Sequence, residues 1–227
     1  MKTRIYIDGF NLYYSLFFIE KEYKFLDPVL LVENLLHHTE LEIDVCKYFT
    51  AKVFPTDTDQ HKAERQNLYW RALEEFHGKE KFQIIKGHFA RKSRKGKVEK
   101  PEECKDKIVQ IKMYEEKKSD VNIASHMLKD VYTTDVEHIV LISNDSDLSE
   151  PLRIVHETTN KKVTLICPIH KYSFSGTHGC SRVAVSKNLT RYASNVIRFI
   201  LPGIIKKSQL PDTLKVQSPW KKIDPAS

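Results

Sequence analysis

Short apolar runs alternate with amphipathic stretches along most of the chain. Apolar runs and period-two alternation predict strands at residues 4–7, 43–54, 82–89, 107–115, 137–143, 162–167 and 196–200. Apolar positions at helical spacing predict helices at residues 10–19, 28–38, 59–77, 119–131, 147–157 and, weakly, 183–193. Because strands alternate with helices, we expect an α/β fold with three layers, in which helices cover both faces of a mostly parallel sheet.

Two of the expected strands flank the most basic segment of the chain. Arg91, Lys92, Arg94 and Lys95 follow the strand at 82–89. We interpret residues from about 82 to 116 as a basic β-hairpin inserted into the α/β domain. Its basic turn could bind the phosphate backbone of RNA, although an ordinary solvated hairpin tip explains the same charges equally well.

The last part of the chain has a different character. From residue 202 the sequence is rich in Lys and Pro and shows no periodicity. We therefore expect one domain over residues 1–201 and an extended tail over residues 202–227. The helix surface over Tyr69–Phe76 is a possible contact between two copies of the chain, so a homodimer is possible.

Composition narrows the class of protein. The chain has 227 residues, of which 41% are apolar and 30% charged, and its net charge is +7 with a pI near 9.1. A basic protein favours a polyanion such as nucleic acid as its partner. No apolar run approaches the ~20 residues of a membrane span, so we expect no membrane partner. The start of the chain shows no cleavable signal, and its four cysteines are scattered, which is typical of a reduced cytoplasmic protein.

Aspartates follow the apolar runs at two places and open a helix at a third. Asp8 ends the first strand, Asp145 and Asp147 follow the strand at 137–143, and Asp120 lies in the first turn of the next helix pattern. The carboxyl ends of parallel strands meet at one edge of a sheet, where α/β proteins bind ligands. Each acid also has a local explanation, as a helix cap, an Asx-turn or a complement to the helix dipole.

Several carboxylates at one edge repel each other unless a cation lies between them. Carboxylate oxygens are the ligands that hard cations prefer, so the pattern predicts a magnesium or manganese site. Such an ion lowers the pKa of a bound water and offsets charge on a phosphodiester. The sequence therefore points to metal-dependent phosphate chemistry.

Three motifs resemble those of the NYN domain, a group within the PIN-like nuclease superfamily. They are IYIDGFNL at residues 5–12, EKKSDV at 116–121 and LISNDSDL at 141–148, and residues 193–200 resemble the closing strand of that family. The resemblance covers about residues 2 to 200. It implies a Rossmann-like, PIN-like sheet and a metal-dependent endoribonuclease that hydrolyses single-stranded or structured RNA.

The resemblance also implies roles for residues. Asp8, Asp120 and Asp145 would be the metal ligands, and Asp147 would be an accessory acid. Asn11 would hold Asp8 or the substrate. Lys117 would contact phosphate, and Ser143 and Asn144 of the third motif would lie at the substrate.

The chain departs from the family pattern at two positions. His126 stands where the family often has another acid, and histidine suits magnesium less well than a carboxylate does. Asn144 replaces the usual glycine before Asp145, a mild change because asparagine tolerates the left-handed conformation. His126 keeps open an alternative, namely a catalytically weak or inactive NYN-type RNA-binding module.

Two other interpretations carry less weight. Cys167, His170, His178 and Cys180 suggest zinc, but their spacing matches no established zinc motif. A phosphatase-like or Toprim-like hydrolase could use Asp145 and Asp147. The residues around Asp8 do not match the first-strand motif of either class.

Overall fold

The computed structural model describes residues 1–17, 21–56, 59–97, 108–177 and 182–211. For residues 17, 21–22, 91 and 112–115 only the backbone is described. The strands are β1 (Lys2–Asp8), β2 (Glu42–Thr50), β3 (Phe82–Lys86), β4 (His88–Lys97), β5 (Ile108–Lys117), β6 (His138–Ile142), β7 (Lys162–Ile166) and β8 (Asn195–Ile197). The α-helices are α1 (Gly9–Leu12), α2 (Pro28–Leu35), α3 (Lys62–His77), α4 (Ser119–Thr133), α5 (Ser149–Thr158), α6 (Lys171–Ser175), α7 (Lys187–Thr190) and α8 (Pro202–Lys207).

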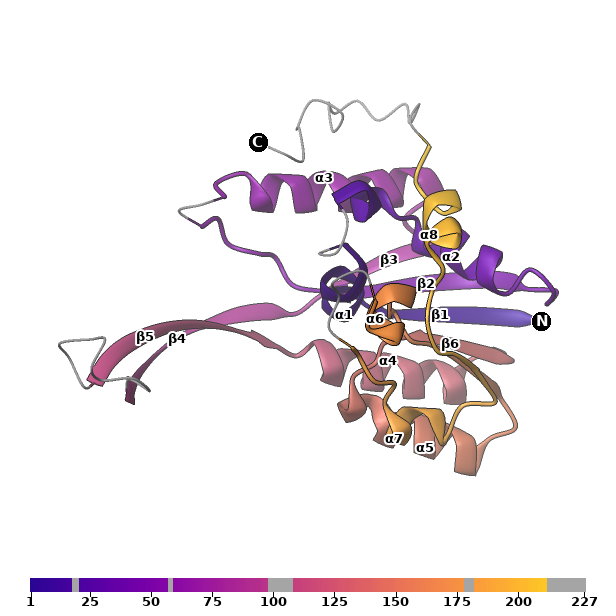
Figure 1. Cartoon of the computed structure of the whole chain (residues 1–227). Helices are drawn as coiled ribbons and strands as arrows, with labels where there is room; N and C mark the ends of the chain where they lie inside the picture. The colour runs from indigo at the N-terminus through magenta and orange to yellow at the C-terminus, as the bar shows by residue number, and fades with distance from the viewer. Residues whose placement is uncertain (18–20, 57–58, 98–107, 178–181, 212–227) are drawn as a thin grey trace.

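The main sheet has six strands in the order β3-β2-β1-β6-β7-β8, and every pair is parallel. This confirms the expected three-layer α/β fold (Figure 1). The chain moves outward in one direction from β1 and returns to the other side of β1 with β6. The carboxyl ends of these two strands therefore form the switch point at which open α/β sheets bind ligands.

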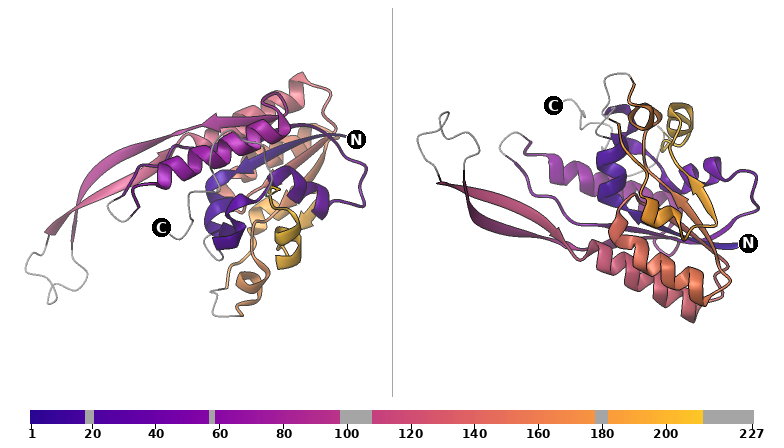
Figure 2. Two further views of the ribbon diagram at one scale, coloured as in Figure 1. Left: turned by 90° about the horizontal axis from the view of Figure 1, so that it is seen from above. Right: turned by 60° about the horizontal axis from the view of Figure 1, so that its bottom comes forward.

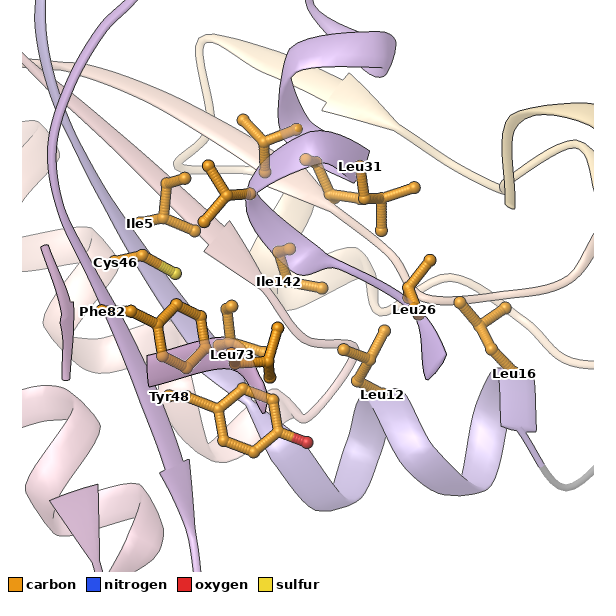
Figure 3. Close-up of a cluster of buried hydrophobic side chains, with 14 of the residues drawn as sticks. Ile5, Leu12, Leu16, Leu26, Leu31, Cys46, Tyr48, Leu73, Phe82 and Ile142 are labelled. Atoms are coloured by element: carbon orange, nitrogen blue, oxygen red, sulfur yellow. The ribbon is translucent and has the colours of Figure 1, made fainter. Parts of the chain in front are cut away.

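Alternate residues of the strands face two separate cores. One core joins the sheet to α1, α2, α3 and α8, and Figure 3 shows part of it around Ile5, Tyr48 and Phe82. The other core joins the sheet to α4, α5 and α7 around Tyr6 and Leu141. Both cores are fully buried at their centres, so the ends of β1 and β6 are held by packing on both faces.

The segment after β1 differs from the expected single helix over residues 10–19. The α-helix ends at Leu12, and residues Tyr13–Phe17 form a π-helical turn. Residues 18–20 lie outside the described part. Short π-helical segments are rare and frequently occur at functional sites, and this one borders the aspartates described below.

The beginning of the expected tail is folded, so the expectation of an extended chain from residue 202 is wrong for its first part. Pro202 opens α8, a position that suits proline because it needs no N–H donor there. Ile205 and Leu210 are buried against α2, and the carbonyl of Ser208 accepts a hydrogen bond from Asp27 N at 2.7 Å. The apolar pattern is too short to reveal a helix in the sequence alone. Residues 212–227 lie outside the described part.

The expected strand at 82–89 is divided at Gly87. Residues before Gly87 belong to the main sheet as β3, and residues after it form β4, which pairs with β5 as an antiparallel hairpin. The hairpin extends far from the body of the molecule in all three views (Figures 1 and 2). A Cβ atom on Gly87 would lie 2.5 Å from the carbonyl oxygen of Lys117, so glycine allows the base of the hairpin to close. Whether the hairpin is an insertion relative to other family members stays a prediction.

A buried group of charges crosses the sheet beneath α4. Asp130 accepts hydrogen bonds from Tyr6 Oη at 2.6 Å and from Lys47 Nζ, and it pairs with Arg4 Nη1 at 3.1 Å. Burial opposes the charged form, yet the bonds from Lys47 and Tyr6 outweigh it and lower the pKa of Asp130. Asp130 therefore carries a negative charge that pairs with the buried cations of Lys47 and Arg4.

None of the helices in the described ranges has the length and the apolar character needed to cross a membrane.

Candidate metal centre

Asp8 ends β1 and caps α1 from the switch point. Its Oδ1 accepts a hydrogen bond from the backbone N–H of Asn11 at 3.0 Å, and its Oδ2 accepts one from Ser143 Oγ at 3.0 Å. Gly9 follows directly, and a Cβ there would lie 2.6 Å from the Tyr48 ring. Glycine at this position lets β1 turn against β2, which fixes the carboxylate of Asp8 at the edge of the sheet.

The loop after β6 is joined to Asp8 through Ser143. This fully buried hydroxyl donates to Asp8 and accepts a hydrogen bond from Asp145 N at 3.0 Å. Asn11 Oδ1 accepts a hydrogen bond from Asn144 N at 3.1 Å. The two motif segments, far apart in the sequence, therefore position each other's acids.

Asp120 approaches the same point from the first turn of α4. Oxygen atoms of Asp8, Asp120 and Asp145 all lie within 4.8 Å of one another. Asp8 is buried, Asp145 is half-buried and Asp120 is exposed, so the group opens to solvent on one side. Two carboxylates at strand ends and one from the start of a helix supply the oxygen ligands that a hard divalent cation prefers.

The pKa values of Asp8 and Asp120 reflect burial and the closeness of the neighbouring carboxylates. Burial raises the pKa of Asp8 to about 6, and the charges of Asp120 and Asp145 act in the same direction. The pKa of Asp120 is also raised, by burial and then by Asp145 and Asp147. Without a cation the site resists full ionisation, which is the behaviour expected of carboxylates arranged for a positive ion.

Glu116 is a fourth acid at this site, and the sequence interpretation gave it no role. It lies near the end of β5 and lines the same pocket as Asp8, Asp120 and Asp145. Burial raises the pKa of Glu116 to about 7, although a hydrogen bond from Ser119 Oγ opposes this. The signal was available, because Glu116 also follows an expected strand.

Two other predicted site residues, Asp147 and Asn144, lie in the segment that follows β6. Asp147 is exposed, and its N–H donates to Asp145 Oδ1 at 3.0 Å. The side chain of Asn144 accepts from Ser186 N and donates to the carbonyl of Ala184, both at 2.9 Å. Asn144 and the buried Ser143 therefore both hydrogen-bond within the protein.

Of the two neighbouring lysines, Lys118 lines the acidic pocket and Lys117 is not among its lining residues. Lys118 has a φ of 80°, a left-handed conformation that costs a non-glycine residue roughly 1–3 kcal/mol. This turn directs the start of α4 and Asp120 toward the pocket. No sequence pattern predicted it.

The basic residues of the hairpin lie away from the aspartates. Lys92, Arg94 and Lys95 belong to β4 along the projecting arm. The side chain of Arg91 lies outside the described part.

His126 and the proposed zinc ligands also lie apart from the acidic pocket. The His126 ring contacts Phe49 with centroids 5.5 Å apart, and burial lowers its pKa. Cys167 is buried, and His170 Nδ1 accepts a hydrogen bond from Tyr172 N. His178 and Cys180 lie outside the described residues, so the zinc interpretation stays a prediction.

Comparison with known proteins identifies the family. The sequence matches the NYN domain over residues 2–183. The chain belongs to the NYN domain family. This confirms the resemblance drawn from the three motifs and gives the chain a PIN-like nuclease domain with an acidic cluster that could bind metal.

Two individual proteins extend the comparison of this NYN domain. The 6-hydroxy-3-succinoylpyridine 3-monooxygenase HspA of Pseudomonas putida (strain DSM 28022 / S16) is 30% identical over 241 residues, which cover 96% of this chain and 73% of that protein. A crystal structure of VPA0982 from Vibrio parahaemolyticus RIMD 2210633, a protein of unknown function, has a TM-score of 0.52 and 18% identity. It covers 92% of this chain and 96% of its own, and it supports the fold.

The raised pKa values predict how pH affects the metal-free protein. Asp8 and Glu116 hold protons more tightly in the folded state than in the unfolded chain, whose carboxyl pKa values are about 4. The free energy of unfolding therefore falls as pH rises from about 4 to about 7. Manganese competes with these protons, so it should raise the melting temperature more at about pH 8 than at about pH 5.

Differential scanning fluorimetry with and without manganese measures this effect. In a Glu116→Gln protein the decline in stability near neutral pH should be smaller. Equal manganese shifts at both pH values would argue against cation binding at these carboxylates.

Proposed function

We propose that this NYN domain is a metal-dependent endoribonuclease that hydrolyses phosphodiester bonds of single-stranded or structured RNA. The observation that supports it most directly is the approach of Asp8, Asp120 and Asp145 to within 4.8 Å at the switch point of the sheet. We further propose that magnesium or manganese is the bound ion, because these cations favour carboxylate and water ligands.

The residues of the chain have distinct roles in this proposal. Asp8, Asp120 and Asp145 hold the cation, and Ser143 and Asn11 keep Asp8 and the neighbouring loop in position. The ion, when bound, activates a water molecule and offsets the charge that develops on the phosphodiester. Glu116, which lines the same pocket, accepts the proton from the attacking water. Lys118 contacts a phosphate at the rim, and Asp147 acts as an accessory acid.

A cleavage assay tests the proposal. Single-stranded and hairpin RNAs are incubated with the protein in manganese, magnesium or a chelator. We expect internal cleavage that needs the cation. RNA that is shifted in a gel but stays intact in every condition would favour the inactive RNA-binding module.

We assign RNA backbone binding to the hairpin. Lys92, Arg94 and Lys95 lie along an arm that extends from the pocket side of the domain. Each contact with a single-stranded phosphate contributes about 0.7 to the slope of log binding constant against log salt concentration. Replacing all three by glutamine should therefore reduce that slope by roughly 2.

The matched control replaces Lys79, Lys81 and Lys162 by glutamine. These exposed lysines carry the same total charge but lie at the opposite edge of the sheet, where the strands begin. Fluorescence anisotropy at several salt concentrations measures both slopes. An equal reduction in the control protein would mean that net charge, not the arm, determines binding.

A second candidate function follows from the relative of known name. HspA is named as a monooxygenase of a substituted pyridine, and an aromatic-lined cavity lies beside the carboxylates of this chain. Oxidation of a pyridine acid is therefore a candidate activity. Consumption of 6-hydroxy-3-succinoylpyridine with dioxygen and a reduced nicotinamide or flavin tests it. The buried free thiols of Cys46 and Cys167 support a reducing compartment such as the cytoplasm for either function.

A further inference from the structure

A cavity of about 160 Å³ lies between the segment after β1 and α3. Much of its wall is aromatic, formed by Tyr13, Tyr14, Phe25, Tyr48, Tyr69 and Trp70, and charged side chains also line it. Pockets that hold drug-sized ligands measure roughly 300–1,000 Å³. This smaller volume suits a single flat ring system, and aromatic walls favour a ring that can stack.

The cavity shares a wall with the acidic pocket. Phe10 and Tyr14 line both spaces. Their rings are stacked with centroids 6.2 Å apart, and the Phe10 ring meets Phe89 at the base of the hairpin edge to face at 5.4 Å. The two spaces are therefore neighbours, as the base and the phosphate of one nucleotide are.

Arg65 also lines the cavity. Arg65 pairs with Asp59 through Nη2, whereas its Nη1 is buried and has no hydrogen-bond partner in the described part of the chain. Buried guanidinium N–H groups are normally paired. Gln66 is already bound to Val53 N and the Ala51 carbonyl, so it fixes the wall. A ring with an acceptor atom would give Nη1 a partner once the guanidinium turns toward the cavity.

We propose that this cavity binds one nucleobase of the RNA, next to the phosphodiester held at the aspartates. The inference rests on the proposed nuclease function and adds a subsite to it. The nucleobase stacks on Tyr14, and the Arg65 guanidinium turns to donate a hydrogen bond to a ring oxygen or nitrogen.

Binding of nucleoside 5′-monophosphates tests the subsite without relying on cleavage. These probes have no internal phosphodiester, so magnesium can be present. Trp70 lines the cavity, and a Trp220→Phe background leaves its fluorescence as the only tryptophan signal. Ribose 5-phosphate lacks the base and competes for the phosphate position, so its binding is measured by displacement of the nucleotide.

Two variants and two matched controls carry the test. Tyr14→Ala removes a ring that is 56% exposed, and Tyr132→Ala removes an equally exposed ring on α4 outside the cavity. Arg65→Met is compared with Arg71→Met on the same helix, because Arg71 is exposed and does not line the cavity. We expect Tyr14→Ala to weaken nucleotide binding roughly 5- to 100-fold. Arg65→Met should also weaken it without changing the binding of ribose 5-phosphate, and both control proteins should bind the nucleotide as the parent protein does.

Equal nucleotide affinity in the variants and their controls would overturn the subsite, even if the parent protein cleaves RNA. So would tight binding of a free aromatic acid that nucleotides fail to displace, since the cavity would then serve a separate small ring. Nucleotide binding that depends on Tyr14, in a protein that cleaves no RNA with either metal, would uphold the subsite and reject the nuclease proposal.

Discussion

Replacing Asp8 by asparagine is expected to lower metal-dependent RNA cleavage by more than about 100-fold. Residues that only orient a metal ligand typically contribute 10- to 100-fold, and Asp8 is assigned as a ligand itself. Asparagine has nearly the same shape, and its carbonyl can still accept the hydrogen bond from Asn11 N. The change therefore removes charge while leaving the local packing intact.

The same change should not lower the melting temperature of the metal-free protein. Burial raises the pKa of Asp8, so its charge opposes folding near neutral pH, and a neutral side chain removes that cost. The control is Asp135→Asn, because Asp135 is an exposed acid at the opposite edge of the sheet. Rates of RNA cleavage and melting curves are compared across these proteins. Undiminished cleavage by both Asp8→Asn and Asp145→Asn would rule out the proposed mechanism.

Replacing Asp130 by alanine is expected to destabilise the fold by roughly 3–5 kcal/mol, because it leaves Lys47 and Arg4 buried without their shared carboxylate. For a domain of this size that loss corresponds to a fall of roughly 6 to 20 °C in melting temperature. Urea unfolding followed by circular dichroism gives the free energy directly.

Two further proteins separate buried charge from charge in general. Glu150→Ala removes an acid of an exposed ion pair with Arg153, which should contribute far less to stability because water screens it. The double variant Asp130→Leu/Lys47→Met should be more stable than Asp130→Ala, because it removes the unpaired cation together with the carboxylate. If Asp130→Ala and Glu150→Ala are equally stable, the buried group does not stabilise the fold.

The central sheet was predictable because its strands are buried on both faces and stand out as apolar runs. The strands predicted at residues 137–143 and 162–167 extend beyond β6 and β7 by no more than one residue at either end. Helix boundaries were less accurate. The expected helix at 147–157 begins as a 3₁₀ turn over Ser146–Leu148 and continues as α5, because Asp145 caps the turn.

The candidate site was predictable to the extent that strand ends are visible in the sequence. Asp8 and Asp145 follow apolar runs, and parallel pairing brings such ends together. Glu116 was missed because it was assigned to the inserted basic hairpin, whereas β5 leads directly into α4 and the acidic pocket. The positive φ of Lys118 and the buried Nη1 of Arg65 depend on tertiary contacts that no local pattern records.

The closing elements β8 and α8 have a practical consequence for how the protein is prepared. The family match ends at residue 183, but β8 pairs with β7 through residues 195–197, and Ile200 and Ile205 complete a core. A chain trimmed to the matched region would leave β7 with an open hydrogen-bonding edge beside uncovered apolar side chains. Such edges recruit strands from other molecules, so the trimmed protein would be prone to aggregation.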